Sequence, residues 1–190
     1  MLSPTAGAVR LDGADVAYWA GTSSGQHLGY LPQDIELFAD TVAANISRFQ
    51  EGRDDEAILA ARMAGVHDMI LRLPAGYDTQ VGDGGTTLSG GLRQRLGLAR
   101  AVYGDPGLVV LDEPSSNLDV EGDAALADCI VQLKQRGTTV VIISHRPSTL
   151  GVVDKILVLR DGVAEMFGPR AVTRLTRAVP VHAVQGTAAG

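Results

Sequence analysis

The stretch Leu108-Val109-Val110-Leu111-Asp112-Glu113-Pro114 decides the fold: four apolar residues are followed by two acids and a proline. Its length and branched side chains predict a buried strand that ends at the acids. Ligands of α/β proteins bind at the carboxyl edge of the sheet, so both carboxylates are expected there. Asp112 can hold a Mg²⁺-bound water, and Glu113 can orient an attacking water. The alternative is a strand followed by an ordinary polar turn.

Helices and strands alternate around this stretch. A strand over 27–31 stops at Pro32, one helix runs from Ser89 to Tyr103, and a second helix ends at Gly137. The buried helix faces are the apolar residues at helical spacing: Leu92, Leu96, Ala99 and Tyr103, then Leu126, Ile130 and Leu133. A buried strand over 139–143 follows, and then a hairpin, 156–159 and 163–167, that turns at Asp161-Gly162. This alternation predicts an α/β fold with a mostly parallel sheet flanked by helices.

Composition and charge narrow the class of protein. The 190 residues are 45% hydrophobic, which is enough for one domain with its own core. The net charge of −6 argues against a protein that grips a nucleic-acid backbone. The single cysteine, Cys129, cannot form an internal disulfide and favours a reducing compartment. No apolar run approaches the roughly 18 residues of a membrane span, and no secretory signal opens the chain, so we expect a cytosolic domain.

Three further signals are weak when each is taken alone. Ser89-Gly90-Gly91 opens a helix whose unpaired amides could bind an anion, although an ordinary serine N-cap explains it equally well. His145 follows the strand 139–143 and could donate to a phosphate oxygen, although a lone histidine is usually structural. Gln33 follows the strand 27–31 and could reach a metal or a water, although glutamine is common in loops.

The order and spacing of these signals resemble the nucleotide-binding domain of ATP-binding cassette (ABC) transporters, over residues 1 to about 170. The matched motifs are the Q-loop at Gln33, the signature at 88–91, the Walker B strand at 108–113, the D-loop at 115–119 and the switch histidine at His145. Residues 31–38 and 41–46 look like exporters, and residues 112–119 resemble the ATPases of type I protein secretion systems. The resemblance implies an ABC ATPase domain over 1–178, with a helical signature subdomain at about 40–103 and a flexible tail at 179–190.

The resemblance also implies ATP and Mg²⁺ as cofactors and a role for each matched residue. Asp112 would hold Mg²⁺ through water, and Glu113 would be the catalytic carboxylate that polarises the attacking water. Gln33 would link the metal, the water and the membrane domain. His145 would steady the γ-phosphate.

Two partners follow from the resemblance. Two ABC ATPase domains of the family pack head to tail with ATP between them, and this chain would donate Ser89, Gly90, Gly91 and Asp119 to the ATP of the second domain. A membrane-spanning exporter domain would be the other partner, which places the chain in the cytoplasm at the inner face of the cell membrane. No nucleic acid is expected. An ABC-type ATPase that acts on DNA or ribosomes is a further alternative, but the segment before the signature leaves no room for a coiled-coil insertion.

Two features depart from the family pattern. The phosphate loop, G-x-x-x-x-G-K-[ST], has no counterpart, because neither Lys134 nor Lys155 follows a glycine. Residues 4–13 match the segment just after that loop's helix, so we expect Met1 to fall inside the family domain and the central strand that leads into the loop to be missing. Leu92 stands where the family usually has glutamine, which we expect to weaken the nucleotide site. A truncated, non-catalytic fragment that cannot bind ATP alone is therefore the main alternative to an ATP-hydrolysing exporter subunit.

Overall fold

The computed structural model describes residues 4–16, 25 and 27–171, which divide into two compact units. The first unit is Met1–Ile143 and the second is Ser144–Gly190. The predicted tail at 179–190 lies outside the described residues. None of the described helices is both long and apolar enough to cross a lipid bilayer.

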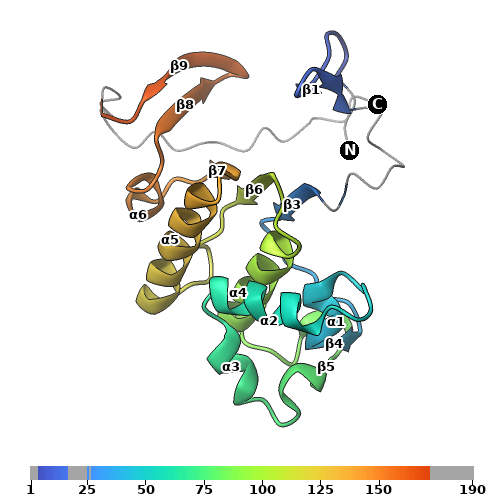
Figure 1. The fold of residues 1–190 in the computed structure, drawn as a ribbon. Coiled ribbons are helices and arrows are strands. Elements are labelled where there is room, and N and C mark those ends of the chain that lie inside the picture. The colour runs from blue at the N-terminus through green and yellow to red at the C-terminus, as the bar shows by residue number, and fades with distance from the viewer. Residues whose placement is uncertain (1–3, 17–24, 26, 172–190) are drawn as a thin grey trace, which may run out of the picture. The chain divides into compact units, whose positions relative to one another are not determined.

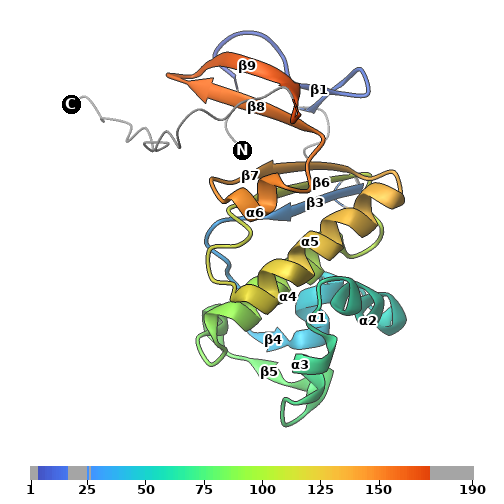
Figure 2. The same cartoon turned by 90° about the vertical axis from the view of Figure 1, so that its left-hand side faces the viewer.

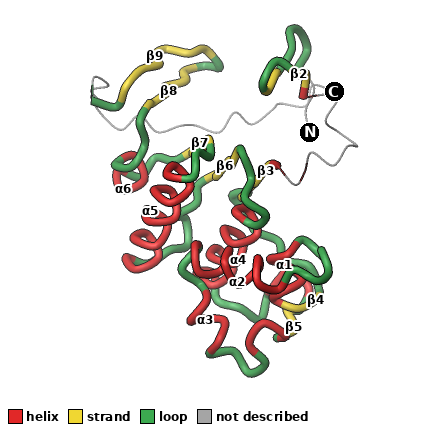
Figure 3. The backbone as a smooth tube through the Cα atoms, in the orientation of Figure 1, coloured by secondary structure: helices red, strands yellow, loops and turns green. Residues whose placement is uncertain are grey.

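The first unit carries most of the regular structure (Figures 1 and 3). Its strands are β1 (Arg10–Leu11), β2 (Ala14–Asp15), β3 (Leu28–Leu31), β4 (Asp40–Thr41), β5 (Gln80–Val81), β6 (Leu108–Asp112) and β7 (Thr139–Ile143). Its helices are α1 (Val42–Ser47), α2 (Asp54–Met63), α3 (His67–Leu71), α4 (Gly90–Val102) and α5 (Val120–Gln135), with short 3₁₀ turns η3 (Gly76–Asp78) and η4 (Asp83–Gly85). The second unit contains α6 (Pro147–Leu150), β8 (Lys155–Arg160) and β9 (Val163–Pro169).

The central sheet of the first unit is parallel, in the order β3-β6-β7, as the sequence predicts. One of its faces is buried under α4 and α5 (Figure 2), with Leu31, Val109 and Leu111 fully covered. The fit is close because Gly97 of α4 has no side chain: a Cβ there would lie 2.9 Å from Leu31 Cδ1. The strand predicted from the apolar run 108–111 is therefore confirmed as the middle strand of the sheet.

The opposite face of the same sheet is open in the part of the chain that the structure describes. The side chains of Tyr30, Val141 and Ile143 point to it and are 52%, 46% and 51% exposed. The prediction that the strand 139–143 is buried is therefore wrong, since none of the residues of β7 is buried. The branched residues of this strand suit a buried position, but burial also needs an element that covers the strand. β7 is the last strand of this sheet, and α5 packs against it.

Helix α4 is the centre of the first unit. The predicted buried face is confirmed, since Leu92, Leu96, Ala99 and Tyr103 are at most 6% exposed. The helix packs against α1, α2 and β3, so it is buried almost all round. The predicted face of α5, which holds Leu126, Ile130 and Leu133, is buried as well.

Arg48, at the end of α1, fastens the end of α4 to the start of β3. It adopts a left-handed backbone conformation (φ +54°). Its guanidinium donates to the carbonyl oxygens of Arg100 (3.0 Å) and Ala101 (3.2 Å) on α4 and of Leu28 (3.3 Å) on β3. These charged hydrogen bonds fix the strand that leads to Gln33.

In the second unit, β8 and β9 form the predicted antiparallel hairpin. Asp161 and Gly162 both have positive φ (+49° and +77°), as the tight turn requires. β8 and β9 make up a two-stranded sheet within the second unit.

Candidate functional site

The paired carboxylates stand at the carboxyl edge of the central sheet. Asp112 is the last residue of β6, in register with Ile143 of β7, and Leu31 of β3 is in register with Leu111. Gln33 lies two residues beyond β3, in a bend, and is exposed. Because parallel strands end at the same edge, the backbone brings Gln33, Asp112 and Glu113 to one side of the sheet.

Glu113 leaves the strand with an unusual backbone conformation. Its φ of +45° is in the left-handed region, which costs a non-glycine residue about 1–2 kcal/mol. Its amide donates to the carbonyl oxygen of Ile143 (2.9 Å), so β7 holds the turn in place. Strained residues of this kind gather at functional sites, which favours a special role for this carboxylate.

The signature turn, residues 88–91, opens α4. The hydroxyl oxygen of Ser89 caps the helix by accepting from the amide of Leu92 (3.3 Å). The amides of Gly90 and Gly91 belong to the first turn and have no partner within the helix. A Cβ on Gly90 would lie 3.7 Å from Asn117 Cβ, and one on Gly91 would lie 3.4 Å from Asn117 O. The turn thus has the unpaired amides of a helix start, which could bind an anion, and it faces the loop after β6.

That loop, the strand-to-helix loop of residues 113–119, connects β6 to α5. Ser115 is fully buried, and Asp119 caps α5 by accepting from the amide of Gly122 (2.8 Å). The Gly122 amide and the guanidinium of Arg95 lower the pKa of the Asp119 carboxyl. Asp119 is therefore a carboxylate with two structural partners, and most of its side chain remains exposed.

A pocket of about 250 Å³ joins the signature turn to the end of the strand-to-helix loop. Its lining residues are Met69, Ser89, Gly91, Leu92, Arg95, Asn117 and Asp119. Leu92 is 6% exposed and packs as part of the buried face of α4. Leucine at this position therefore fills the core and also forms one wall of the pocket.

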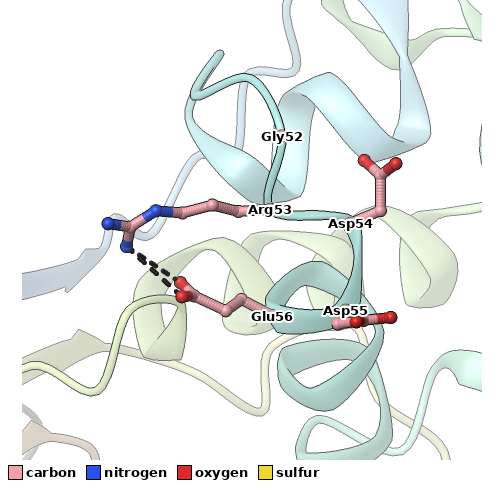
Figure 4. Close-up of a pocket in the computed structure, with 5 residues that line it drawn as sticks. All are labelled: Gly52, Arg53, Asp54, Asp55 and Glu56. Carbon is pink, nitrogen blue, oxygen red and sulfur yellow. Dashed lines mark hydrogen bonds and ion pairs between the residues drawn. The ribbon is translucent and has the colours of Figure 1, made fainter.

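A larger hollow lies elsewhere, at the start of α2, and has no part in this site (Figure 4). It is lined by Gly52, Arg53, Asp54, Asp55 and Glu56, and the Arg53 guanidinium pairs with the Glu56 carboxylate at 3.2 Å. None of the site residues predicted from the sequence lines it. Three acids in one turn repel a phosphate, so this hollow is not a nucleotide site even though it is larger than the signature pocket.

Two residues of the pocket region were not identified by the sequence analysis: Gln94 and Arg95. Gln94 and Arg95 are 1% and 5% exposed, and both donate hydrogen bonds to the backbone. Polar residues between the apolar positions of a helix usually face solvent, so their pattern alone gives no signal.

The catalytic and binding roles of all these residues remain predictions. The structure brings Gln33, Asp112 and Glu113 to one sheet edge and Ser89, Gly91 and Asp119 around one pocket. Gly90 lies in the same turn, between Ser89 and Gly91. His145 follows β7 by two residues and belongs to the second unit. Its approach to the γ-phosphate is therefore inferred only from the chain order.

A parallel sheet with two carboxylates at its edge, connected to a glycine-opened helix, defines an α/β domain of the nucleotide-binding class. The sequence profile of the ABC transporter family matches residues 1–116, and the chain belongs to that family. The type I secretion system ATP-binding protein PrsD of Rhizobium meliloti (strain 1021) is 57% identical over 165 residues, which are 86% of this chain and 28% of PrsD. ATP-binding cassette sub-family B member 6 of Homo sapiens is 42% identical over 160 residues, 83% of this chain and 19% of that protein.

The fold has the same relatives. A solved structure of a bacterial Atm1-family ABC exporter with ATP bound superposes with a TM-score of 0.80 at 36% identity, covering 89% of this chain and 30% of the exporter. The chain thus spans less than a third of the length of these proteins.

Proposed function

We propose that this chain supplies the ATP-hydrolysing domain of an ABC exporter, most like those of type I protein secretion. One observation carries the proposal: a single short loop begins with Glu113 at the sheet edge and ends with Asp119 at the signature pocket. In this proposal, part of the hydrolytic half of an ABC ATP site and the donated half stand on one unit. The similarity to PrsD supports the assignment to type I secretion.

The hydrolytic half has side chains that suit Mg²⁺ and water. The Asp112 carboxylate and the Gln33 amide oxygen are the kind of ligand that Mg²⁺ prefers, and both stand at the same sheet edge. The ion, when bound with ATP, neutralises charge on the phosphates. Glu113 acts as the general base that polarises the attacking water. By the family resemblance, His145 would donate a hydrogen bond to the γ-phosphate.

The donated half binds the phosphate of a second domain through the signature turn. The amides of Gly90 and Gly91 point out of the helix start, where the helix dipole favours a negative charge. The missing side chains let a phosphate oxygen approach the backbone. The Ser89 oxygen accepts from the Leu92 amide, so its own proton remains available to donate to the phosphate. A second ABC ATPase domain, packed head to tail, is the partner that this arrangement needs.

The other proposed partner is a membrane-spanning exporter domain, to which Gln33 would transmit the state of the nucleotide. This places the chain in the cytoplasm, at the inner face of the cell membrane.

One observation favours a second candidate, a non-catalytic domain that only completes the site of a partner. The 190 residues contain no Gly-Lys pair and hence no phosphate loop. Such a loop supplies several charge-assisted hydrogen bonds, each worth about 1.5–3 kcal/mol. The loss of two lowers affinity by roughly a hundredfold to ten-thousandfold. We expect no measurable Mg-ATP binding by residues 1–190 in calorimetry at micromolar concentrations.

Fusion of the chain to the part of PrsD that precedes its matching segment tests the proposal. The fusion protein should bind and hydrolyse Mg-ATP. Its Glu113→Gln variant should keep binding and lose turnover, because an amide cannot act as a base. Glu51→Gln, an exposed acid outside the site, is the matched control and should keep full turnover. Parental turnover in Glu113→Gln would remove Glu113 as the catalytic carboxylate, and ATP binding without turnover in the parent fusion would favour the second candidate.

A further inference from the structure

Two adjacent polar side chains in the first half of α4 are buried although the proposed chemistry does not use them. Gln94 is 1% exposed and Arg95 is 5% exposed. Glutamine and arginine are rarely buried unless each of their polar groups finds a partner. Both lie one helical turn below the signature glycines, since Gly90 and Gln94, and Gly91 and Arg95, are four residues apart.

Gln94 binds the first part of the strand-to-helix loop. Its Nε2 donates to the carbonyl oxygen of Pro114 (2.9 Å). Its Oε1 accepts from Asn117 Nδ2 (3.4 Å) and from Ser116 Oγ (3.5 Å). Pro114 directly follows Glu113, so Gln94 fixes the backbone next to the proposed catalytic carboxylate.

Arg95 binds the end of the same loop. Its Nη2 donates to Asp119 Oδ1 (3.1 Å), and its Nη1 donates to the carbonyl oxygen of Gly65 (3.1 Å) in the turn between α2 and α3. Asp119 also caps α5 through the amide of Gly122. The side chain of Arg95 therefore joins α4, α5 and the turn after α2.

We propose that Gln94 and Arg95 are positioning residues that hold the signature turn and the strand-to-helix loop together as one piece. This inference rests on the proposed function, in which Glu113 serves the ATP of the chain itself and the signature turn serves the ATP of the second domain. Both segments are clamped to α4, so displacement of one displaces the other. The two ATP sites of a dimer are then mechanically linked through each chain.

Hydrogen exchange of the full 190-residue chain, without nucleotide, tests the clamp. In Gln94→Met and Arg95→Met the amides of 88–92 and of 113–119 should exchange at least about tenfold faster, because each variant removes buried hydrogen bonds. The amides of β6 should not change. Arg62→Met, an exposed arginine at the end of α2, is the matched control and should leave all rates unchanged.

Three results would overturn the inference: no change, a change in only one of the two segments, or an equal rise throughout the central sheet. If Arg95→Met does not fold, Arg95→Lys replaces it, because lysine keeps the charge but not the forked geometry of the guanidinium. The amides of 113–119 should still exchange faster in Arg95→Lys. Unchanged exchange of these amides would count against the clamp.

The fusion protein with the PrsD segment gives a second measurement. Gln94→Met should lower kcat at least tenfold with little change in KM for ATP, since the carboxylate is misplaced while the binding groups remain. An unchanged kcat would contradict the positioning role. If the parent fusion is inactive, that result counts against the proposed function. The clamp is still tested, because the hydrogen-exchange experiment uses no nucleotide and does not depend on ATP turnover.

Discussion

Replacement of Gly29 by alanine would separate β3 from α4. A Cβ at Gly29 would lie 2.0 Å from the carbonyl oxygen of Ala101 and 3.1 Å from Val109 Cγ2. Both neighbours are held in the core, so the strand and the helix would have to move apart by about 1 Å, and overpacking of this kind costs about 1–3 kcal/mol. The movement also stretches the hydrogen bond from Arg48 to Ala101, now 3.2 Å, and loss of a charged hydrogen bond costs about 1.5–3 kcal/mol.

We therefore expect Gly29→Ala to lower the free energy of unfolding by about 3–5 kcal/mol, a large part of the 5–15 kcal/mol typical of a domain. In urea unfolding followed by far-ultraviolet circular dichroism, this shifts the midpoint down by about 2 M. Gly107→Ala is the matched control: a Cβ there would meet nothing within 4 Å, so its midpoint should not move. A Gly29→Ala midpoint equal to that of the control would refute the close docking of β3, and with it the fixed placement of Gln33.

Three further predictions concern the site, the core and the open sheet face. Gly91→Ala should change the free energy of unfolding by no more than about 1 kcal/mol, because a Cβ would lie at an ordinary 3.4 Å from Asn117 O. It should nevertheless reduce ATP turnover of the PrsD fusion at least tenfold, because the added methyl group blocks the approach of the phosphate. Unchanged turnover would contradict the proposal that the signature turn binds the ATP of the second domain. Burial raises the pKa of the Cys129 thiol to about 12, so the folded state favours the neutral thiol. This contribution to the stability of the fold is fully present below the ordinary thiol pKa and is lost as the pH rises toward 12. A thiol reagent should label Cys129 rapidly only in denaturant, and fast labelling of the folded chain at neutral pH would count against its burial. Val141→Thr with Ile143→Thr should weaken concentration-dependent association in light scattering, because both side chains are about half exposed on one sheet face; equal association in parent and variant would show that this face is not the cause.

The sequence predicted the helix and strand order well because those signals are local. The apolar run at 108–111, the helical spacing of Leu92 and Leu96, and the Asp161-Gly162 turn each depend on neighbours within a few residues, and all three are confirmed. The placement of Asp112 and Glu113 at a sheet edge follows directly from a strand that ends at acids. The family of the chain also follows from the order of the motifs, and the match to the family profile confirms it.

The sequence did not predict which buried positions are polar. Gln94 and Arg95 appear in the chain as ordinary helix residues, and their burial depends on Pro114, Asp119 and Gly65 coming to the same place. Those three residues are 20 to 30 positions away from Gln94 and Arg95. No local periodicity carries information about such partners.

The sequence alone determined that the chain is an α/β ABC-type domain with carboxylates at the sheet edge and glycines at a helix start, because periodicity and motif spacing are properties of the chain itself. Only the tertiary structure decided that Gln94 and Arg95 are buried, that Val141 and Ile143 remain exposed, and that α4 clamps the loop between Glu113 and Asp119. Burial depends on what packs against a residue, and for these residues the packing partners are distant in the sequence or, on the open sheet face, not among the described residues.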